Sequence, residues 1–267
     1  MTTLQLKTEK MIAEVENGVG WITFNQPEKR NAVSYEMWTA IPEIIDAFTA
    51  DPAVRVVVMK GAGDRAFVSG ADISEFEEKR NTPEQVEIYE QATGAANRAL
   101  RTIEMPLIAM IRGFCIGGGL AISLAADLRI TADDGQFAVP AAKLGLGYGY
   151  GGIKELMHVV GPSFAKEIFF TGRRFDAEEA RTMGLVNRVV PVADLESQTK
   201  ELAELIAANA PLTVKAAKAA VNEGTKEAAE RDLGRIDAMV KACFDSEDYK
   251  EGRRAFMEKR RPQFQGR

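Results

Sequence analysis

Three consecutive glycines, Gly117 to Gly119, separate an apolar run from a segment of helix-forming residues. The apolar run, 107–111, has the composition of a buried strand, and 120–126 is rich in alanine and leucine. The first turn of a helix leaves backbone N–H groups without intrahelical partners, and glycine lets a ligand oxygen approach them closely. Such a turn could stabilise negative charge that develops on oxygen. The alternative, a structural glycine turn inside an α/β core, stays open at this point.

A second segment with the same order of elements occurs earlier, in residues 66–76. An apolar stretch leads to Gly70, and Asp72 stands where a helix would begin. A carboxylate at that place is most often an N-cap, because it accepts hydrogen bonds from the free N–H groups of the first turn. We therefore interpret Asp72 as a cap in the first instance.

Other common chemistries lack the residues that they need. His158 is the only histidine, which argues against a histidine-ligated metal and against a Ser-His-Asp triad, so we expect no metal site. Gly147, Gly149 and Gly152 have the spacing of a dinucleotide fingerprint. The acidic residue that ribose binding asks for, about 20 positions further on, is absent.

Composition and charge are those of an ordinary soluble protein. The 267 residues are 46% hydrophobic and 27% charged, and the net charge of −5 argues against binding to nucleic acid or to anionic membranes. Cys115 and Cys243 have no metal-ligand neighbours, so we expect reduced thiols in a cytoplasmic protein. The N-terminal residues lack the apolar stretch of a secretion signal, and the apolar stretch 105–127 carries Arg112 and four glycines, so it fails as a membrane span.

Local patterns predict an α/β core to about residue 190, followed by a helical part. Asn17-Gly18 between two alternating runs predicts a β-hairpin. Ser34 and Thr82 are expected N-caps of two helices. The other predicted strands are 54–59, 107–111, 128–131, 136–139 and 186–190.

Several ordered motifs run through nearly the whole chain. They are Phe67-Val-Ser-Gly-Ala-Asp-Ile73, Gly113-Phe-Cys-Ile-Gly-Gly-Gly-Leu120, Gln136-Phe-Ala-Val-Pro140, Leu144-Gly-Leu-Gly147, 170–180, 184–190 and 249–260. Together they resemble the enoyl-CoA hydratase/isomerase (crotonase) superfamily. The resemblance implies an α/β fold built as a spiral of ββα units with a helical C-terminal part, assembled as a homotrimer or a dimer of trimers. It divides the chain into a core with an acyl-CoA site, 1–195, and a helical trimerisation region, 196–267.

The resemblance also implies roles for the two turns. The N–H groups of Ala71 and Gly118 would point at the thioester oxygen of an acyl-CoA substrate and form an oxyanion hole for its enolate. Phe256 and Lys259 would reach the CoA nucleotide, of the same or a neighbouring subunit, although Lys259 could also belong to a solvated basic tail. CoA is part of the substrate, so no separate cofactor is expected. Residues implied to line the CoA channel are Arg30, Ala32, Ser69, Asp72 and Ile73.

The chain departs from the hydratases of this superfamily at two positions. Those enzymes carry one glutamate two positions after the glycine triplet and another directly after the proline of the Gln-Phe-x-x-Pro motif. Here the two positions are Ala121 and Ala141. Methyl groups cannot transfer protons, so we do not expect ordinary hydration of an enoyl-CoA. Both alanines are expected to line the substrate pocket.

Tyr148 and Tyr150, in a glycine-rich loop, are the remaining candidates in that region. A tyrosine near an oxyanion hole can donate a hydrogen bond to a carboxylate or deliver a proton. The loop 144–148 and the ending 244–252 resemble bacterial methylmalonyl-CoA decarboxylases, which have a tyrosine matching Tyr148. The match is incomplete, because those enzymes have a polar side chain and a glutamate where this chain has alanines 71 and 121. Tyr148 could instead form an aromatic wall of the acyl pocket, and Tyr150 is assigned to substrate binding.

Three hypotheses about function follow. The first is an acyl-CoA enzyme with enolate chemistry but no glutamate pair, such as a decarboxylase or an isomerase-like lyase. The second is a divergent enoyl-CoA hydratase whose acid/base group comes from Glu75, Glu77, Glu78 or their neighbours up to Glu90. The third is a non-catalytic acyl-CoA-binding protein.

Overall fold

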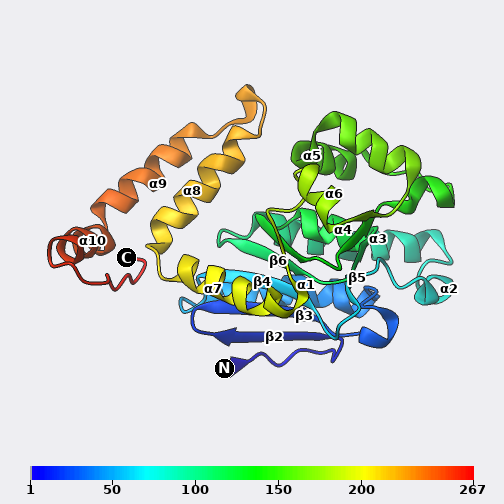
Figure 1. Cartoon of the computed structure of the whole chain (residues 1–267), viewed down its shortest axis with the longest axis horizontal. Helices are drawn as coiled ribbons and strands as arrows, with labels where there is room; N and C mark the ends of the chain where they lie inside the picture. The colour runs from blue at the N-terminus through cyan, green and yellow to red at the C-terminus, as the bar shows by residue number, and fades with distance from the viewer. Residues whose placement is uncertain (1) are drawn as a thin grey trace.

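The computed structural model describes residues 2–267, without the side chain of Glu77. In this part of the chain, two β-sheets lie at the centre and helices cover them, while α8 to α10 project to one side (Figure 1). The larger sheet has the strand order β1-β2-β3-β4-β6-β8-β11, and the smaller has the order β10-β9-β7-β5. None of the helices in the described range is long and apolar enough to cross a membrane.

The strands and helices have the following residue ranges, in chain order. The strands are β1 (Thr2–Thr3), β2 (Met11–Glu16), β3 (Val19–Phe24), β4 (Val56–Gly61), β5 (Ala66–Val68), β6 (Leu107–Ile111), β7 (Phe114–Ile116), β8 (Leu128–Ala132), β9 (Gln136–Ala138), β10 (Phe175–Asp176) and β11 (Arg188–Val190). The α-helices are α1 (Tyr35–Ala50), α2 (Phe76–Lys79), α3 (Pro83–Thr102), α4 (Gly118–Leu124), α5 (Tyr150–Thr171), α6 (Ala177–Thr182), α7 (Leu195–Ala207), α8 (Pro211–Gly224), α9 (Leu233–Asp245) and α10 (Glu247–Met257). Short 3-10 helices are η1 (Pro27–Lys29), η2 (Ile73–Glu75), η3 (Pro140–Leu144), η4 (Val192–Asp194) and η5 (Ala228–Glu230).

The chain alternates between the two sheets. Strands β4, β6 and β8 are parallel neighbours in the larger sheet. The strands that follow each of them, β5, β7 and β9, are parallel neighbours in the smaller sheet. Helices α3, α4 and α5 come after β5, β7 and β9. Each repeat therefore adds a strand to both sheets and then a helix, which confirms the predicted spiral of ββα units.

The hairpin and the first two long helices begin at the residues that the local sequence signals predicted. Asn17 and Gly18 have φ of +52° and +81° and join β2 to β3 in an antiparallel hairpin. The Ser34 hydroxyl accepts a hydrogen bond from the N–H of Met37 and caps α1. Thr82 caps α3 in a box with Gln85.

One expectation about the glycine triplet is corrected. The apolar run 107–111 forms β6 in the larger sheet, and a separate strand, β7, leads into the glycines. Gly113 makes the bend between the two sheets, with φ of +59°. A Cβ on Gly113 would overlap the carbonyl oxygen of Arg65, so the chain can pass only with glycine at this point. The short length of β7 hides it within a sequence that looks like one strand followed by a turn.

The larger sheet is buried on both faces. Ile22 and Val57 point into the main core, while Trp21 and Val58, their neighbours in sequence, pack against α7 on the other face. A sheet buried on both faces needs apolar residues at successive positions, which explains the continuous apolar runs of its central strands. The helix α7 therefore lies against the sheet rather than with α8 to α10 (Figure 1).

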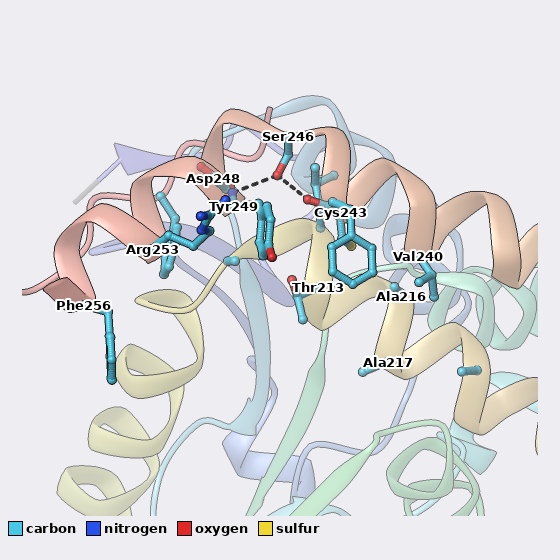
Figure 2. A pocket seen from close by; sticks show the side chains of 16 residues that line it. Thr213, Ala216, Ala217, Val240, Cys243, Ser246, Asp248, Tyr249, Arg253 and Phe256 are labelled. Carbon is cyan, nitrogen blue, oxygen red and sulfur yellow. Dashed lines mark hydrogen bonds between the residues drawn. The ribbon is translucent and has the colours of Figure 1, made fainter.

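Helices α8 to α10 form an arm with an apolar hollow. A cavity of about 720 Å³ lies between them, and its lining includes Ala216, Val240, Phe244, Tyr249 and Phe256 (Figure 2). Several of these side chains are exposed in the single chain. The assignment of the C-terminal region to trimerisation remains a prediction.

Candidate active site

The two turns singled out in the sequence meet in space. Strands β5 and β7 are parallel neighbours, so their carboxyl ends lie at the same edge of the smaller sheet. Ala71 follows β5, and Gly118 is the first residue of α4 after β7. A Cβ placed on Gly118 would lie 3.6 Å from the backbone nitrogen of Ala71. The sheet therefore brings together two N–H groups that are 47 residues apart (118 − 71).

Neither N–H group has a partner within the described residues. On either side of Ala71, Gly70 O accepts from the N–H of Val33 (2.8 Å) and the N–H of Asp72 donates to Val33 O (2.9 Å). The Ala71 N–H therefore points away from that segment. The Gly118 N–H begins a helix and has no carbonyl one turn earlier within α4 to accept its bond. Two unpaired donors side by side, one at a helix N-terminus, can stabilise a negatively charged oxygen.

Gly119 holds α4 against β5. A Cβ on Gly119 would overlap the carbonyl oxygen of Val68, so only glycine allows the helix to come this close. The turn before α4 is held as well, because the N–H of Gly117 donates to Ala138 O of β9 (2.8 Å). Helix–strand packing therefore keeps Gly118 beside Ala71.

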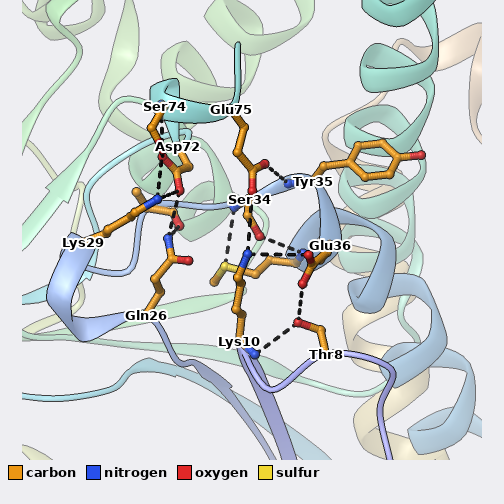
Figure 3. Close-up of polar contacts among 12 residues, drawn as sticks. Thr8, Lys10, Gln26, Lys29, Ser34, Tyr35, Glu36, Asp72, Ser74 and Glu75 are labelled. Atoms are coloured by element: carbon orange, nitrogen blue, oxygen red, sulfur yellow. Dashed lines mark hydrogen bonds and ion pairs between the residues drawn. The ribbon is translucent and has the colours of Figure 1, made fainter. Parts of the chain in front are cut away.

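Asp72 is the N-cap of η2, which confirms the structural interpretation of this carboxylate. It is 4% exposed, and Oδ1 accepts from the N–H (3.1 Å) and hydroxyl (2.6 Å) of Ser74. Its Oδ2 accepts from Lys29 Nζ (2.7 Å) and Gln26 Nε2 (3.1 Å) (Figure 3). Burial raises the pKa of the Asp72 carboxyl, but the hydrogen bonds from Lys29, Ser74 and Gln26 outweigh burial and hold this pKa below its ordinary value. The Asp72 carboxylate is therefore ionised, and each of its two oxygens already accepts two hydrogen bonds.

The residues predicted to line a CoA channel lie in the loop before α1 and in the turn after β5. Arg30 has φ of +54° and places its guanidinium 5.2 Å from the ring centre of Phe114. The Ser69 hydroxyl donates to Lys29 O, and Ala32 O accepts from Gln26 Nε2. Ile73 is 75% exposed. Their contacts with a substrate remain predictions.

Ala121 and Ala141 lie at the ends of neighbouring strands. Ala121 is in the first turn of α4, after β7, and Ala141 is buried in η3, after β9. Strands β7 and β9 are parallel neighbours, so both methyl groups belong to the sheet edge that carries Gly118. Neither can transfer a proton. Cys115 in β7 is no substitute, because burial raises the pKa of its thiol to about 12.

Tyr148 packs between α5 and the core. Its ring centre is 4.9 Å from that of Phe169, and a Cβ on Gly152 would collide with the Tyr148 ring. Burial raises the pKa of Tyr148, and the positive charge of Arg101 offsets only part of this effect. The phenol is therefore neutral and can donate a hydrogen bond. Tyr150 is 75% exposed at the start of α5.

The structure gives little support to Glu75 or Glu78 as the acid/base group of the second hypothesis. Glu75 accepts a hydrogen bond from the N–H of Tyr35 (2.8 Å) and forms an ion pair with Lys10 (Figure 3). Its carboxylate therefore ties η2 to α1. Glu78 is exposed, and the side chain of Glu77 lies outside the described residues.

Phe256 and Lys259 lie far from the paired N–H groups of their own chain. Phe256 is in α10 and Lys259 just beyond it; α10 lies at the outer end of the arm, whereas α4 lies beside the sheets (Figure 1). Phe256 is 83% exposed and lines the apolar hollow of the arm (Figure 2). The structure does not bring these two residues to the site within one chain.

Comparison with known proteins identifies the family. The model of the enoyl-CoA hydratase/isomerase family matches residues 14–267. The chain belongs to this family. It is 36% identical to a short-chain-enoyl-CoA hydratase from Clostridium acetobutylicum, with 96% of this chain and 97% of the relative covered. It is 34% identical to a crotonyl-CoA hydratase from Syntrophomonas wolfei, with 96% and 98% covered.

A solved structure of the family has the same fold. An enoyl-CoA hydratase/carnithine racemase from Magnetospirillum magneticum superposes with a TM-score of 0.87, at 34% identity, with 98% of this chain and 97% of that chain covered. These comparisons confirm the predicted family, the crotonase fold and an enzyme class acting on acyl-CoA. The resemblance to methylmalonyl-CoA decarboxylases remains a prediction.

The sequence did not point to Gln26 or Lys29. Both belong to the site region because they bind Asp72, which lies 46 and 43 residues further along the chain. No local pattern marks a lysine or a glutamine as the partner of a distant carboxylate. The pairing of Gln26 and Lys29 with Asp72 is seen only in the fold, where the end of β5 lies beside the loop before α1.

Proposed function

We propose that this member of the enoyl-CoA hydratase/isomerase family stabilises a thioester enolate between the N–H groups of Ala71 and Gly118, without a pair of catalytic glutamates. The observation that carries the proposal is the convergence of these two unpaired donors at the ends of β5 and β7. The thioester oxygen of an acyl-CoA would accept both hydrogen bonds. The bonds strengthen as negative charge develops on that oxygen, which lowers the barrier to enolate formation.

The reaction we favour generates its carbanion without a strong base. Loss of CO₂ from an acyl-CoA with a carboxylate on its α-carbon breaks the bond between that carbon and the carboxylate and leaves the electron pair in the thioester enolate. The enolate then takes a proton at the α-carbon. Tyr148, with its raised pKa, would be the neutral donor that delivers this proton or holds the substrate carboxylate. Ala121 and Ala141 are compatible with this chemistry, because it asks no base to activate water.

A divergent hydratase is the second candidate, since the two curated relatives described above are named as hydratases. Hydration of an enoyl-CoA needs a group that activates water and a group that protonates the α-carbon. The carboxylates of Asp72 and Glu75 are engaged by other residues, so this candidate must recruit its acid and base elsewhere. Non-catalytic acyl-CoA binding is the remaining alternative.

The distinguishing experiment is mass spectrometry of the protein incubated in parallel with crotonyl-CoA and methylmalonyl-CoA. We expect loss of CO₂ from methylmalonyl-CoA that is abolished in Tyr148→Phe and retained in Tyr249→Phe, a tyrosine in α10. Hydration of crotonyl-CoA at an ordinary enzymatic rate would contradict the role given to the two alanines. Binding of both thioesters without turnover would favour a binding protein.

We propose that the assembled state is a homotrimer or a dimer of trimers built through α8 to α10. The exposed apolar side chains of this arm support the proposal. Assembly would also carry Phe256 and Lys259 to a neighbouring chain, where they could reach the CoA nucleotide.

A further inference from the structure

We infer that Asp72, held by Lys29 and Gln26, is a positioning residue that aims the Ala71 N–H at the substrate oxygen. The inference rests on the proposed function, because it concerns the donor that the proposed enolate would use. Asp72 acts through the backbone, and its own carboxylate has no free oxygen for a substrate.

The direction of the Ala71 N–H is set by the peptide unit to which it belongs. That unit also contains the carbonyl of Gly70, and in a trans peptide the C=O and N–H bonds point in opposite directions. The Gly70 carbonyl accepts from the N–H of Val33 at 2.8 Å. The position of Val33 therefore determines where the Ala71 N–H points.

Val33 is at the end of the loop that Asp72 holds in place. Gln26 Nε2 donates both to the Asp72 carboxylate and to Ala32 O, the residue before Val33. Lys29 Nζ donates to Asp72 Oδ2 and to the Ser74 hydroxyl, which joins the same loop to η2 (Figure 3). A closed ring of hydrogen bonds thus runs from the carboxylate through the loop to the peptide unit that carries the Ala71 N–H.

The peptide unit needs this support because its own residues offer little restraint. Gly70 has φ of +120°, a conformation from which glycine can move easily, and Ala71 has only a methyl side chain. Side chains fix this turn chiefly through the Asp72 carboxylate, because the Ser69 hydroxyl makes a single longer bond of 3.3 Å to Lys29 O. Without the carboxylate, the peptide unit would depend mainly on the backbone hydrogen bonds that Val33 makes with Gly70 and Asp72, and its direction would be less well defined.

Lys29 has a second effect, which is electrostatic. Its hydrogen bond to Asp72 raises the pKa of Lys29, so the pair carries one positive and one negative charge. Without Lys29, an uncompensated carboxylate would remain one residue from a donor that must stabilise an anion. We therefore expect Lys29→Met to weaken the polarisation of a bound thioester, and Lys29→Arg to restore part of it.

The test is the isotope-edited infrared spectrum of the thioester carbonyl of bound butyryl-CoA, a saturated probe that cannot be hydrated. Hydrogen bonds in the oxyanion hole should lower the C=O stretching frequency in the wild type. We expect Asp72→Asn to lose most of this downshift while still binding butyryl-CoA. In whichever reaction the enzyme proves to run, kcat should fall by up to about 100-fold with a smaller change in KM.

Glu223→Gln is the matched control. Glu223 is also buried, paired with a lysine (Lys226, 2.6 Å) and bonded to a backbone N–H (Asp232, 2.9 Å), but it lies in α8, away from the turns. This variant should keep the full downshift. If Asp72→Asn does not fold, the infrared spectrum of Lys29→Met tests the inference instead. This variant should fold, because the Lys29 side chain is half exposed and its replacement leaves no buried cavity.

The outcomes separate the inference from the proposed function. A downshift in the wild type that survives in Asp72→Asn, or in Lys29→Met where that variant must decide, would overturn the inference and leave the oxyanion hole intact. No downshift in the wild type would overturn the proposed function and the inference together. Equal losses in Asp72→Asn and Glu223→Gln would mean a general effect on folding and would also overturn the inference.

Discussion

Ala121 and Ala141 distinguish this pocket from that of a hydratase with a glutamate pair. The backbone around them keeps the arrangement expected of the family, with two unpaired N–H groups at the ends of β5 and β7. A pocket with the donors but without the carboxylates can stabilise an enolate that forms by another route. We therefore expect the reaction to be determined by a few side chains, while the backbone of the site keeps the arrangement of the family.

The contribution of the Gly118 N–H can be measured with two variants at that position. Gly118→Pro removes the donor, and proline is well accepted at the first residue of a helix. Gly118→Ala retains the donor, and its Cβ would lie no closer than 3.6 Å to its nearest neighbour. We expect kcat to fall roughly 100- to 1000-fold in the proline variant and by a smaller factor in the alanine variant, which keeps the N–H but adds a methyl group beside the Ala71 nitrogen.

Thermal unfolding of both variants supplies the control for this comparison. Similar unfolding temperatures would assign the difference in kcat to the N–H group. Equal activity of the proline and alanine variants would mean that Gly118 is not an oxyanion donor.

At the scale of elements, the active site depends on how closely α4 packs on β5. The two are in contact at Gly119, where any side chain would meet the carbonyl of Val68. This contact, more than the sequence of α4 itself, keeps Gly118 beside Ala71. The three glycines therefore differ in their structural roles: Gly117 turns the chain, Gly118 begins α4 with a free N–H group, and Gly119 packs against β5.

Gly119→Ala should move α4 away from β5. We expect a loss of about 1–3 kcal/mol in the free energy of unfolding, typical of an overpacked contact, together with a large loss of activity. Chemical denaturation measures the first effect and steady-state kinetics the second. Gly118→Ala, one residue away in a roomier position, serves as the control. Unchanged stability in Gly119→Ala would show that the helix can shift without cost.

At the scale of the whole molecule, the arm formed by α8 to α10 is the part whose apolar surface a single chain leaves uncovered. Its hollow is apolar, and Phe244 and Phe256 expose their rings. Covering such an apolar surface is favourable in water, and in the proposed assembly a second copy of the same chain would cover it.

Phe244→Asp should therefore dissociate the assembly. A charge in the middle of an apolar interface is costly because the interface cannot solvate it. We expect sedimentation velocity to show a trimer or a hexamer for the wild type and smaller species for the variant. Asp237→Asn, also in α9, is a control that leaves the hollow unchanged. A monomeric wild type would contradict the proposed assembly.

The sequence determined the family, the two strand–turn–helix segments and most element boundaries, because these follow from local patterns. The Asn17-Gly18 hairpin and the caps at Ser34 and Thr82 each depend on a few adjacent residues. The sequence also led to the prediction that a glutamate pair is absent, because Ala121 and Ala141 stand at the two motif positions where the resemblance implies glutamates. It misplaced the strand before the glycine triplet, because β7 has only three residues and follows a longer apolar strand.

Only the tertiary structure decided which groups meet. Parallel pairing of β5 with β7 places Ala71 beside Gly118, and the return of the chain past its first loop gives Asp72 its partners Gln26 and Lys29. Tyr148 likewise acquired its packing against Phe169 and its raised pKa from burial. Sequence spacing carries no information about such contacts, because hydrogen bonds and burial depend on distances that the fold sets.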